Sequence, residues 1–304
     1  MSVLSGLWLD SERWDQKFAA ASEGPKTVVG TMRISAVVLS FNSAHFLETC
    51  IDSLAAAFAE NEDQNEIRVI ENGSKDASPA LLRGLEAKYP GLLHVTYLDH
   101  NTGTTASRNL ALRQASGRYL LIMDSDVDMP KGTIETLIRR VDSDASCGIA
   151  VPRLNYPSGR LQMSTDVFPT LGRKLQRFFA LKAMERRANR PPTEPTMVDY
   201  AISAVWLFRR DVLDTVGLLD EKIFYSPEDV DYCLRVWAAG YTVVYDPTVH
   251  AVHDAQEISR GLFPLRKSTF SHAGGLLYLF RKHGYAFGHK RLYHRLNRFS
   301  NGAG

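Results

Sequence analysis

Residues 120–130 read LLIMDSDVDMP, an apolar run that leads into three aspartates at alternate positions, Asp124, Asp126 and Asp128. The apolar part predicts a strand buried in a sheet. Close carboxylates repel one another, and burying them without partners is costly. We therefore expect a positive charge to lie beside this cluster.

The chain around this stretch alternates between buried strands and helices. Strands are predicted at 33–41, 67–70, 94–98, 119–123 and 148–152, and helices at 79–89, 106–116 and 132–141. A further helix through Leu54 is expected to be capped by Asn42 and Ser43. This alternation indicates an α/β fold with a mainly parallel sheet and helices on both faces.

The second half of the chain is less regular. It is predicted to contain a loop at 186–196, an apolar segment at 199–208, a short helix at 210–217, a helix from Ser226 to Gly240 and a strand at 241–245. Gly172–Arg190 and the residues from Ala255 onward are basic and interleaved with apolar side chains. Such stretches favour either an anionic membrane surface or ligand, or a solvated helix face. Leucines near the C-terminus fit packing on the main domain of the chain or on a second subunit, so a homodimer stays open.

Composition narrows the class of protein. The 304 residues are 44% hydrophobic and 23% charged, with a formal charge of +2, which is typical of a globular protein and argues against a nucleic-acid partner. The cysteines Cys50, Cys147 and Cys233 lie far apart without metal-ligand spacing, which favours a reduced, cytoplasmic setting. No apolar run approaches the ~18 residues that a membrane-spanning helix needs, and the N-terminus does not resemble a secretory signal.

Polar clusters follow four of the predicted strands, at 40–42, 71–74, 99–103 and 124–128. Ligands of parallel sheets bind at the carboxyl ends of the strands, so these clusters predict one shared site. Asp124 and Asp126 have the spacing to hold a hard cation such as Mg²⁺ or Mn²⁺. Either His250 or His253 is expected to add a third ligand, with His253 preferred. The alternative is that a histidine here has only a structural role, with its ring hydrogen-bonded to the backbone.

Other polar residues suit substrate chemistry. Glu228 and Asp229 begin a helix, where one carboxylate can act as general base and the other can complement the helix dipole. Glu71 and Asn72 follow a strand, where they could meet a base and a ribose or simply build a turn. Arg108 opens a helix, where it could meet a diphosphate or stand exposed.

The motifs VVLSFN, IENGSKD, NTGTTASRN, MDSD, ISAVWLFRR, GLLDEKIF, PEDVDYCLR and AAGY occur in this order. Over residues 33–255 the series resembles the inverting glycosyltransferases of family 2, which have the GT-A fold, and most of all their rhamnosyltransferase branch. The resemblance implies a Rossmann-like catalytic domain with a nucleotide-binding half at 33–128 and an acceptor half at 129–255. Residues 1–32 would be a tail or accessory helix, and 256–304 a basic helical extension.

The resemblance also implies roles for individual residues. The nucleotide-sugar donor would contact Ser40, Phe41, Asn42, Glu71, Asn101, Gly103, Arg108, Asp124, Ser125 and Trp206. The metal ligands would be Asp126, His253 and Asp124. Asp229 would be the general base, oriented by Glu228. Glu71 stands where the family more often has Asp, and Ser203 where it commonly has Gly.

The function that follows is a metal-dependent transfer of a sugar, with inversion, to a hydroxyl of a growing or lipid-linked glycan. The expected donor is dTDP-rhamnose, and the expected location is the cytoplasm or the inner face of the plasma membrane. A UDP-hexose or UDP-GlcNAc transferase is the alternative within the fold. A non-catalytic nucleotide-sugar-binding module is opposed by the intact acids, and a sugar-1-phosphate nucleotidyltransferase by the stretch SFNSAHF, which lacks a Gly-rich basic loop.

Overall fold

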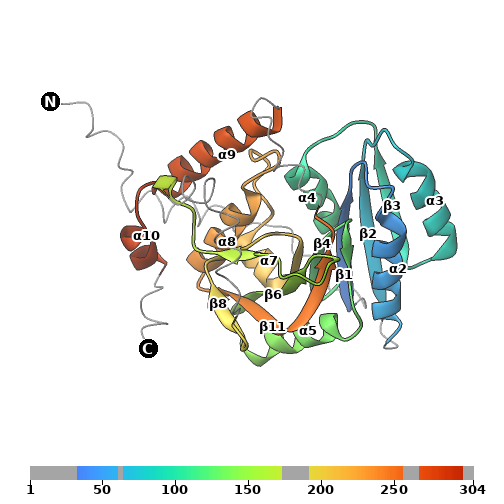
Figure 1. The fold of residues 1–304 in the computed structure, drawn as a ribbon, viewed down its shortest axis with the longest axis horizontal. Helices are drawn as coiled ribbons and strands as arrows, with labels where there is room; N and C mark the ends of the chain where they lie inside the picture. Colours follow the sequence, from blue (N-terminus) through green and yellow to red (C-terminus); the bar gives the residue numbers. More distant parts are fainter. Residues whose placement is uncertain (1–32, 61–63, 173–191, 256–266, 297–304) are drawn as a thin grey trace.

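The structure is a computed structural model that describes residues 33–60, 64–172, 192–255 and 267–296 (Figure 1). The predicted tail or accessory helix at 1–32, the basic stretch after Gly172 and the predicted loop up to residue 191 lie outside the described residues.

The first half of the chain forms β1 (Ile34–Ser40), α2 (Leu47–Phe58), β2 (Asn65–Asn72), α3 (Ser78–Lys88), β3 (Leu93–Leu98), α4 (Thr104–Gln114), β4 (Tyr119–Asp124), β5 (Val127–Asp128), α5 (Thr133–Ser143) and β6 (Cys147–Asn155). The second half forms β7 (Thr165–Asp166), β8 (Thr196–Val198), β9 (Tyr200–Ala201), β10 (Val205–Arg209), α7 (Arg210–Val216), α8 (Glu228–Ala238), β11 (Thr242–His253), α9 (Lys267–His283) and α10 (Lys290–Arg295).

One mixed sheet organises the fold. Within the described residues it has nine strands, in the order β3-β2-β1-β4-β10-β6-β11-β5, with β8 paired to β11. The strands β3, β2, β1 and β4 run parallel, as do β6 and β11, while β10 is antiparallel to both of its neighbours. The predicted α/β fold with a largely parallel sheet is confirmed.

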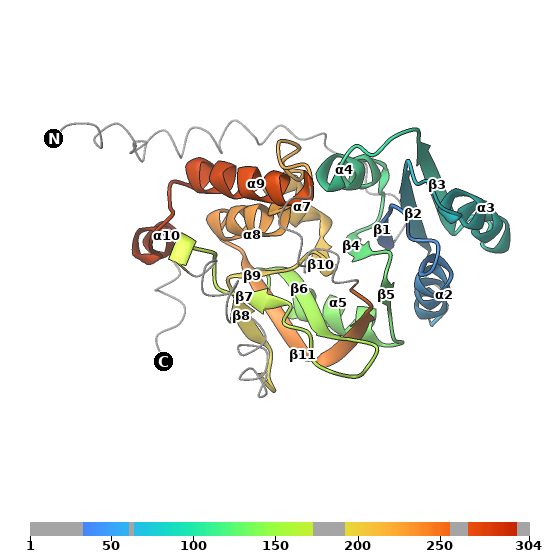
Figure 2. The same ribbon diagram turned by 45° about the horizontal axis from the view of Figure 1, so that its top comes forward.

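Helices cover both faces of the sheet and give the molecule two apolar cores. Ala36 and Val38 of β1 face the core beneath α2, α3 and α5, whereas Val37 faces the core beneath α4, α7 and α8. Successive strand residues point to opposite faces, so burial on both sides explains the unbroken apolar run. The second core also takes in Leu279 of α9, which lies over α8 (Figure 2).

Two local predictions were wrong. The helix α2 begins only at Leu47 and no side chain caps it, because Asn42 adopts a left-handed backbone conformation with φ 52° and the chain turns before the helix starts. The strand β11 does not stop at Tyr245 but continues to His253, with a register shift between Asp246 and His250. Among the described residues, no helix has both the length and the apolarity to cross a membrane.

Candidate active site

The carboxyl ends of three neighbouring strands bring the predicted polar clusters to one edge of the sheet. In the parallel register Ser40 of β1 lies beside Glu71 of β2, and Leu39 lies beside Asp124 of β4. Asn72 at the end of β2 donates to Asn101 Oδ1 at 3.1 Å and so ties the 99–103 cluster to the same edge. The sheet register therefore assembles the site from segments that are distant in sequence.

Asp124, Asp126 and His253 form a compact group. Each offers one ligand atom, and these atoms lie within 4.8 Å of one another. The short strand β5 pairs with the end of β11, so that His253 lies opposite Val127, and the Asp254 amide donates to the Asp126 carbonyl at 2.9 Å. Backbone pairing thus brings the histidine to the aspartates.

The imidazole of His253 is buried and held on both sides. Its Nε2 lies 3.2 Å from Asp126 Oδ1, and its Nδ1 lies 2.9 Å from Gln162 Oε1. Burial lowers the pKa of His253, but the hydrogen bond and charge of Asp126 outweigh it and raise the pKa overall. His250 is only half-buried and belongs to no such group in the described chain, and its carbonyl accepts from Thr133 Oγ1 at 3.0 Å. Of the two histidines, His253 is the one beside the aspartates.

The donor set suits a hard divalent ion. Two carboxylates and one imidazole match the ligands that Mn²⁺ accepts, and Mg²⁺ is served by the same carboxylates together with oxygens of a bound diphosphate. The residues present therefore fit a metal of this class.

Arg108 supplies a positive charge from within the chain. Its side chain is 2% exposed, and its guanidinium donates to the Asp124 carboxylate and to Ser203 Oγ at 2.7 Å. The same guanidinium lies 3.4 Å from Glu228 Oε1. The predicted cation beside the aspartates is thus at least in part this arginine, which answers the repulsion expected at the end of β4.

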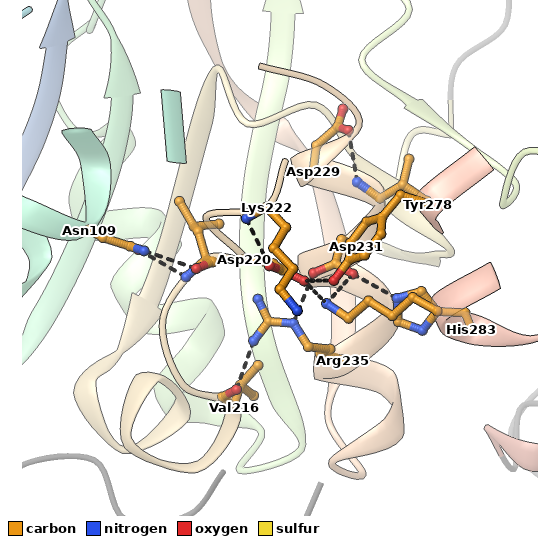
Figure 3. Close-up of polar contacts among 12 residues, drawn as sticks. Asn109, Val216, Asp220, Lys222, Asp229, Asp231, Arg235, Tyr278 and His283 are labelled. Atoms are coloured by element: carbon orange, nitrogen blue, oxygen red, sulfur yellow. Dashed lines mark hydrogen bonds and ion pairs between the residues drawn. The ribbon is translucent and has the colours of Figure 1, made fainter. Parts of the chain in front are cut away.

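Glu228 and Asp229 form the first turn of α8, where the helix dipole favours negative charge. Glu228 is 8% exposed and accepts from Ser203 Oγ at 2.9 Å. Burial, and then the charge of Asp229, raise the pKa of Glu228 to about 8 against the opposing charge of Arg108. Asp229 is half-buried, and its Oδ1 accepts from the Val230 amide at 2.8 Å (Figure 3). The two neighbouring acids thus differ in environment, as a general base and a supporting carboxyl require.

The predicted nucleoside-binding residues lie at the ends of β1 and β2. Glu71 is buried and accepts from the Ser74 amide at 2.8 Å, while Asn42 Oδ1 accepts from the Lys75 amide at 2.8 Å. Phe41 is 41% exposed beside them. These contacts make a rigid edge in which one aromatic ring stays accessible for stacking.

The remaining predicted donor residues border this edge or support it. Ser40 is fully buried, and Ser125 Oγ lies 2.8 Å from Ser43 Oγ. Asn101 Oδ1 accepts from the Gly103 amide at 2.8 Å. At Gly103, where φ is 87°, a Cβ would lie 2.5 Å from the Phe224 carbonyl, so only glycine allows this close approach.

The family of this protein follows from the match of its sequence to a protein-family model. The model described as glycosyl transferase family 2 matches residues 35–217. The chain belongs to glycosyl transferase family 2. This family 2 chain is therefore a glycosyltransferase, and the family and enzyme class that the sequence motifs predicted are confirmed.

Curated relatives of this family 2 glycosyltransferase include two rhamnosyltransferases. Rhamnosyltransferase WbbL of Escherichia coli K12 is 24% identical over 245 residues, which cover 77% of this chain and 90% of that protein. The N-acetylglucosaminyl-diphospho-decaprenol L-rhamnosyltransferase of Mycobacterium tuberculosis is 25% identical over 264 residues, or 81% of this chain and 84% of that protein.

Solved structures of glycosyltransferases share the fold. The mannosyltransferase PcManGT of Pyrobaculum calidifontis, in complex with GDP-Man and Mn²⁺, aligns with a TM-score of 0.56 at 18% identity over 95% of this chain and 77% of its own. TarS of S. aureus aligns with a TM-score of 0.52 at 19% identity, over 74% of this chain but only 37% of its own length. The GT-A fold of this family 2 chain is thereby confirmed.

One predicted site residue of this family 2 glycosyltransferase, Trp206, packs in the second apolar core. Trp206 is fully buried, and its ring stacks on Tyr232 at 5.6 Å in the core beneath α8. The expectation that it borders the donor sugar or the acceptor stays a prediction. Trp206 pairs with Ile122, two residues before Asp124 on β4, so its side chain lies on the same face of the sheet as Asp124.

Three side chains at the site were not assigned a role from the sequence. Ser203, noted from the sequence only as a departure from the family's usual glycine, links Arg108 to Glu228, and Gln162 contacts His253. Tyr225 is 53% exposed, and its pKa is raised by desolvation and then by the charges of Asp124 and Glu228. The aromatic pair Phe224–Tyr225, close before the PEDVD motif, could have indicated that Tyr225 lies at the site. Gln162 lies in an irregular segment whose sequence gives no such indication.

Proposed function

We propose that this protein is a metal-dependent, inverting glycosyltransferase that moves rhamnose from dTDP-rhamnose to a hydroxyl of a growing or lipid-linked glycan. The observation that carries the proposal is the meeting of two groups at one sheet edge. The group Asp124, Asp126 and His253 is joined through Arg108 to Glu228, the neighbour of Asp229 in the first turn of α8.

The donor side of the reaction is assigned to the ends of β1, β2 and β4. Phe41 and Glu71 would hold the base, and Asp124 the ribose or the sugar. Asp126, Asp124 and His253 would hold Mg²⁺ or Mn²⁺. When bound, the ion neutralises charge that grows on the departing diphosphate. Arg108, held by Ser203, keeps the Asp124 carboxylate oriented toward the donor.

The acceptor side is assigned to the start of α8. Asp229 takes the proton of the acceptor hydroxyl as its oxygen attacks the anomeric carbon from the face opposite the diphosphate. The bond to the diphosphate breaks in the same displacement, so the configuration inverts and no sugar–enzyme bond forms. Glu228, whose pKa is raised to about 8, remains largely protonated at neutral pH and so spares Asp229 a second adjacent negative charge.

The test of this assignment is the variant Asp229→Asn. It should lower kcat by about 10²-fold, the scale of lost general-base catalysis, while donor binding stays intact. Asp211→Asn, at an exposed position near the start of α7, serves as a matched control that keeps normal turnover. Near-normal kcat in Asp229→Asn would remove the base role, and full activity in metal-free buffer would remove the metal.

The identity of the donor is tested by thermal unfolding with nucleotide sugars. A ligand that binds the folded state alone raises Tm by mass action. The proposal expects dTDP-rhamnose with Mn²⁺ to raise Tm more than UDP-GlcNAc or UDP-hexoses do. A larger shift with a UDP-sugar would assign the alternative donor class, and no shift with any of them would contradict nucleotide-sugar binding.

The acceptor is proposed to be lipid-linked, and the enzyme to work at the cytoplasmic face of a membrane. One support is the mycobacterial relative, whose name includes a decaprenyl diphosphate. The other is the pair of helices α9 and α10, whose residues 267–296 include no acid. Exposed side chains of this stretch include Leu277 and Arg281 of α9 and Phe287 of the connection between the two helices.

A further inference from the structure

The helix α9 packs against the turn that leads into Glu228. A Cβ built on Gly275 would lie 2.3 Å from the Ser226 carbonyl oxygen and 3.0 Å from Pro227 Cδ. The backbone of α9 therefore rests directly on the residues that precede the two acids of α8. A side chain at Gly275 cannot be added unless this turn moves.

A buried charge cluster also fixes α9 to α8, at a position after Glu228 and Asp229 in the chain (Figure 3). Asp231 is 1% exposed and accepts from Arg235 Nε at 3.0 Å, from His283 Nε2 at 2.7 Å and from Lys282 Nζ at 2.7 Å. Lys282 also donates to Asp220 at 2.6 Å. Removing one member would leave the others buried without compensation, so the cluster holds α9 in one register.

These two contacts bracket the acid pair. Gly275 meets the chain just before Glu228, and Lys282 and His283 meet it at Asp231, two residues after Asp229. The proposed chemistry uses none of these three α9 residues, and all of α8 and α9 lie beyond the stretch matched by the family model. These three α9 residues therefore lie beside the acid pair without taking part in the proposed chemistry.

We infer that α9 is a positioning element that fixes the first turn of α8 and so sets the place of the Asp229 carboxylate relative to the acceptor. The inference rests on the proposed role of Asp229 as base. Displacing a catalytic group by about 1 Å can cost roughly 10²-fold in rate. Loosening this contact should thus lower turnover while the donor side, built on β1, β2 and β4, is unchanged.

The test compares Gly275→Ala with Gly274→Ala. Both replace a glycine within α9 by alanine and gain the same helix propensity, about 1 kcal/mol. At Gly274 a Cβ meets nothing within 4 Å, whereas at Gly275 it meets the Ser226 carbonyl. We expect Gly275→Ala to lower kcat at least about tenfold. The KM for the donor should stay near the value of Gly274→Ala, which should keep normal kcat, while Tm should fall modestly because the added Cβ overpacks the contact with Ser226.

A second pair of variants tests the charge cluster in the same assay. Lys282→Met should lower kcat with the donor KM unchanged, and Lys282→Arg, which keeps the charge, should restore most of it. Asp229→Asn is measured alongside. Loss of activity in Asp229→Asn with normal kcat in Gly275→Ala and Lys282→Met would overturn the inference alone, whereas normal kcat in Asp229→Asn would overturn the base assignment. Loss of donor binding in Gly275→Ala would also overturn the inference, because it would indicate general damage.

Discussion

The Arg108 guanidinium joins two acidic side chains that serve opposite halves of the proposed reaction, Asp124 on the donor side and Glu228 on the acceptor side. The residue types at the strand ends were readable from the sequence because each follows a periodic apolar run. Which of them meet was not readable, because Arg108 reaches Ser203 across 95 positions of the chain. An exposed helical arginine and a buried bridging one have the same local sequence.

Gln162 offers a prediction at the scale of one residue. Its Oε1 is 2.9 Å from His253 Nδ1, so that Nε2 of the ring faces Asp126. Such partners of metal ligands typically contribute 10- to 100-fold to metal affinity. Gln162→Leu should therefore weaken Mn²⁺ binding by about that factor, as measured by electron paramagnetic resonance of free Mn²⁺. Gln162→Glu keeps an acceptor oxygen and should bind at least as tightly as the wild type. Unchanged affinity in Gln162→Leu, beside a clear loss in Asp126→Asn, would contradict this role.

At the scale of elements, the strands and helices of the first half follow their sequence patterns closely, because long apolar periods dominate there. The strand β11 shows why the second half does not. Asp246–Pro247 looks like a turn, yet Asp246 is fully buried and paired with Arg140 Nε of α5 at 3.0 Å. The cation that compensates the buried Asp246 carboxylate comes from a residue 106 positions away, so the sequence around Asp246 gives no sign of it.

The contact between α8 and α9 depends on pH in a defined direction. Burial alone would raise the pKa of Asp231, but Arg235, His283 and Lys282 lower it below its ordinary value of 3.8. The folded state therefore gains stability from this carboxylate above pH 3.8 and loses it as the pH falls further. Asp231→Asn should cost roughly 3–5 kcal/mol at pH 7, measured by urea unfolding, because the buried Arg235 loses its charged partner and Lys282 and His283 lose a charged acceptor.

The size of this effect is judged against an exposed ion pair. Asp52→Asn removes the partner of Lys88, whose side chain is 46% exposed, and should cost far less. The gap between Asp231→Asn and the wild type should narrow as the pH falls below 3.8, because the unfolded wild-type chain then takes up a proton at this carboxyl that the folded state, with its lower pKa, does not. A gap that widened in acid, or equal losses in the two variants, would contradict the assignment.

At the scale of the whole molecule, the sequence left open whether the C-terminal leucines pack on the catalytic domain or on a second subunit. Leu279 and Phe280 lie in the same core as Val212 and Leu234, so α9 packs on its own chain. Leu277 on the same helix is 72% exposed and Phe287 is 88% exposed. The apolar pattern of this helix could not distinguish packing on the same chain from packing on a second subunit, because both kinds of contact use the same apolar residue types.

The exposed side of α9 and α10 predicts how the molecule meets a membrane. Arg281, Lys290 and Arg291 lie exposed on the same two helices as Leu277 or near Phe287. Each such basic residue adds about 1 kcal/mol of attraction to an anionic surface. The protein should co-sediment with vesicles that contain phosphatidylserine, less at high salt, and hardly with phosphatidylcholine alone. The double variant Leu277→Ser, Phe287→Ser should bind less. Equal binding to both kinds of vesicle would argue against this orientation.

The ladder between β5 and β11 has one more consequence. Peptide hydrogen bonds between β5 and β11 hold His253 next to Asp126, so the proposed metal ligands would stay together after an ion leaves. Such a site would allow a cation to bind together with the diphosphate of each donor and to dissociate with the nucleotide product. The cation would then exchange with ions in solution once in every catalytic cycle.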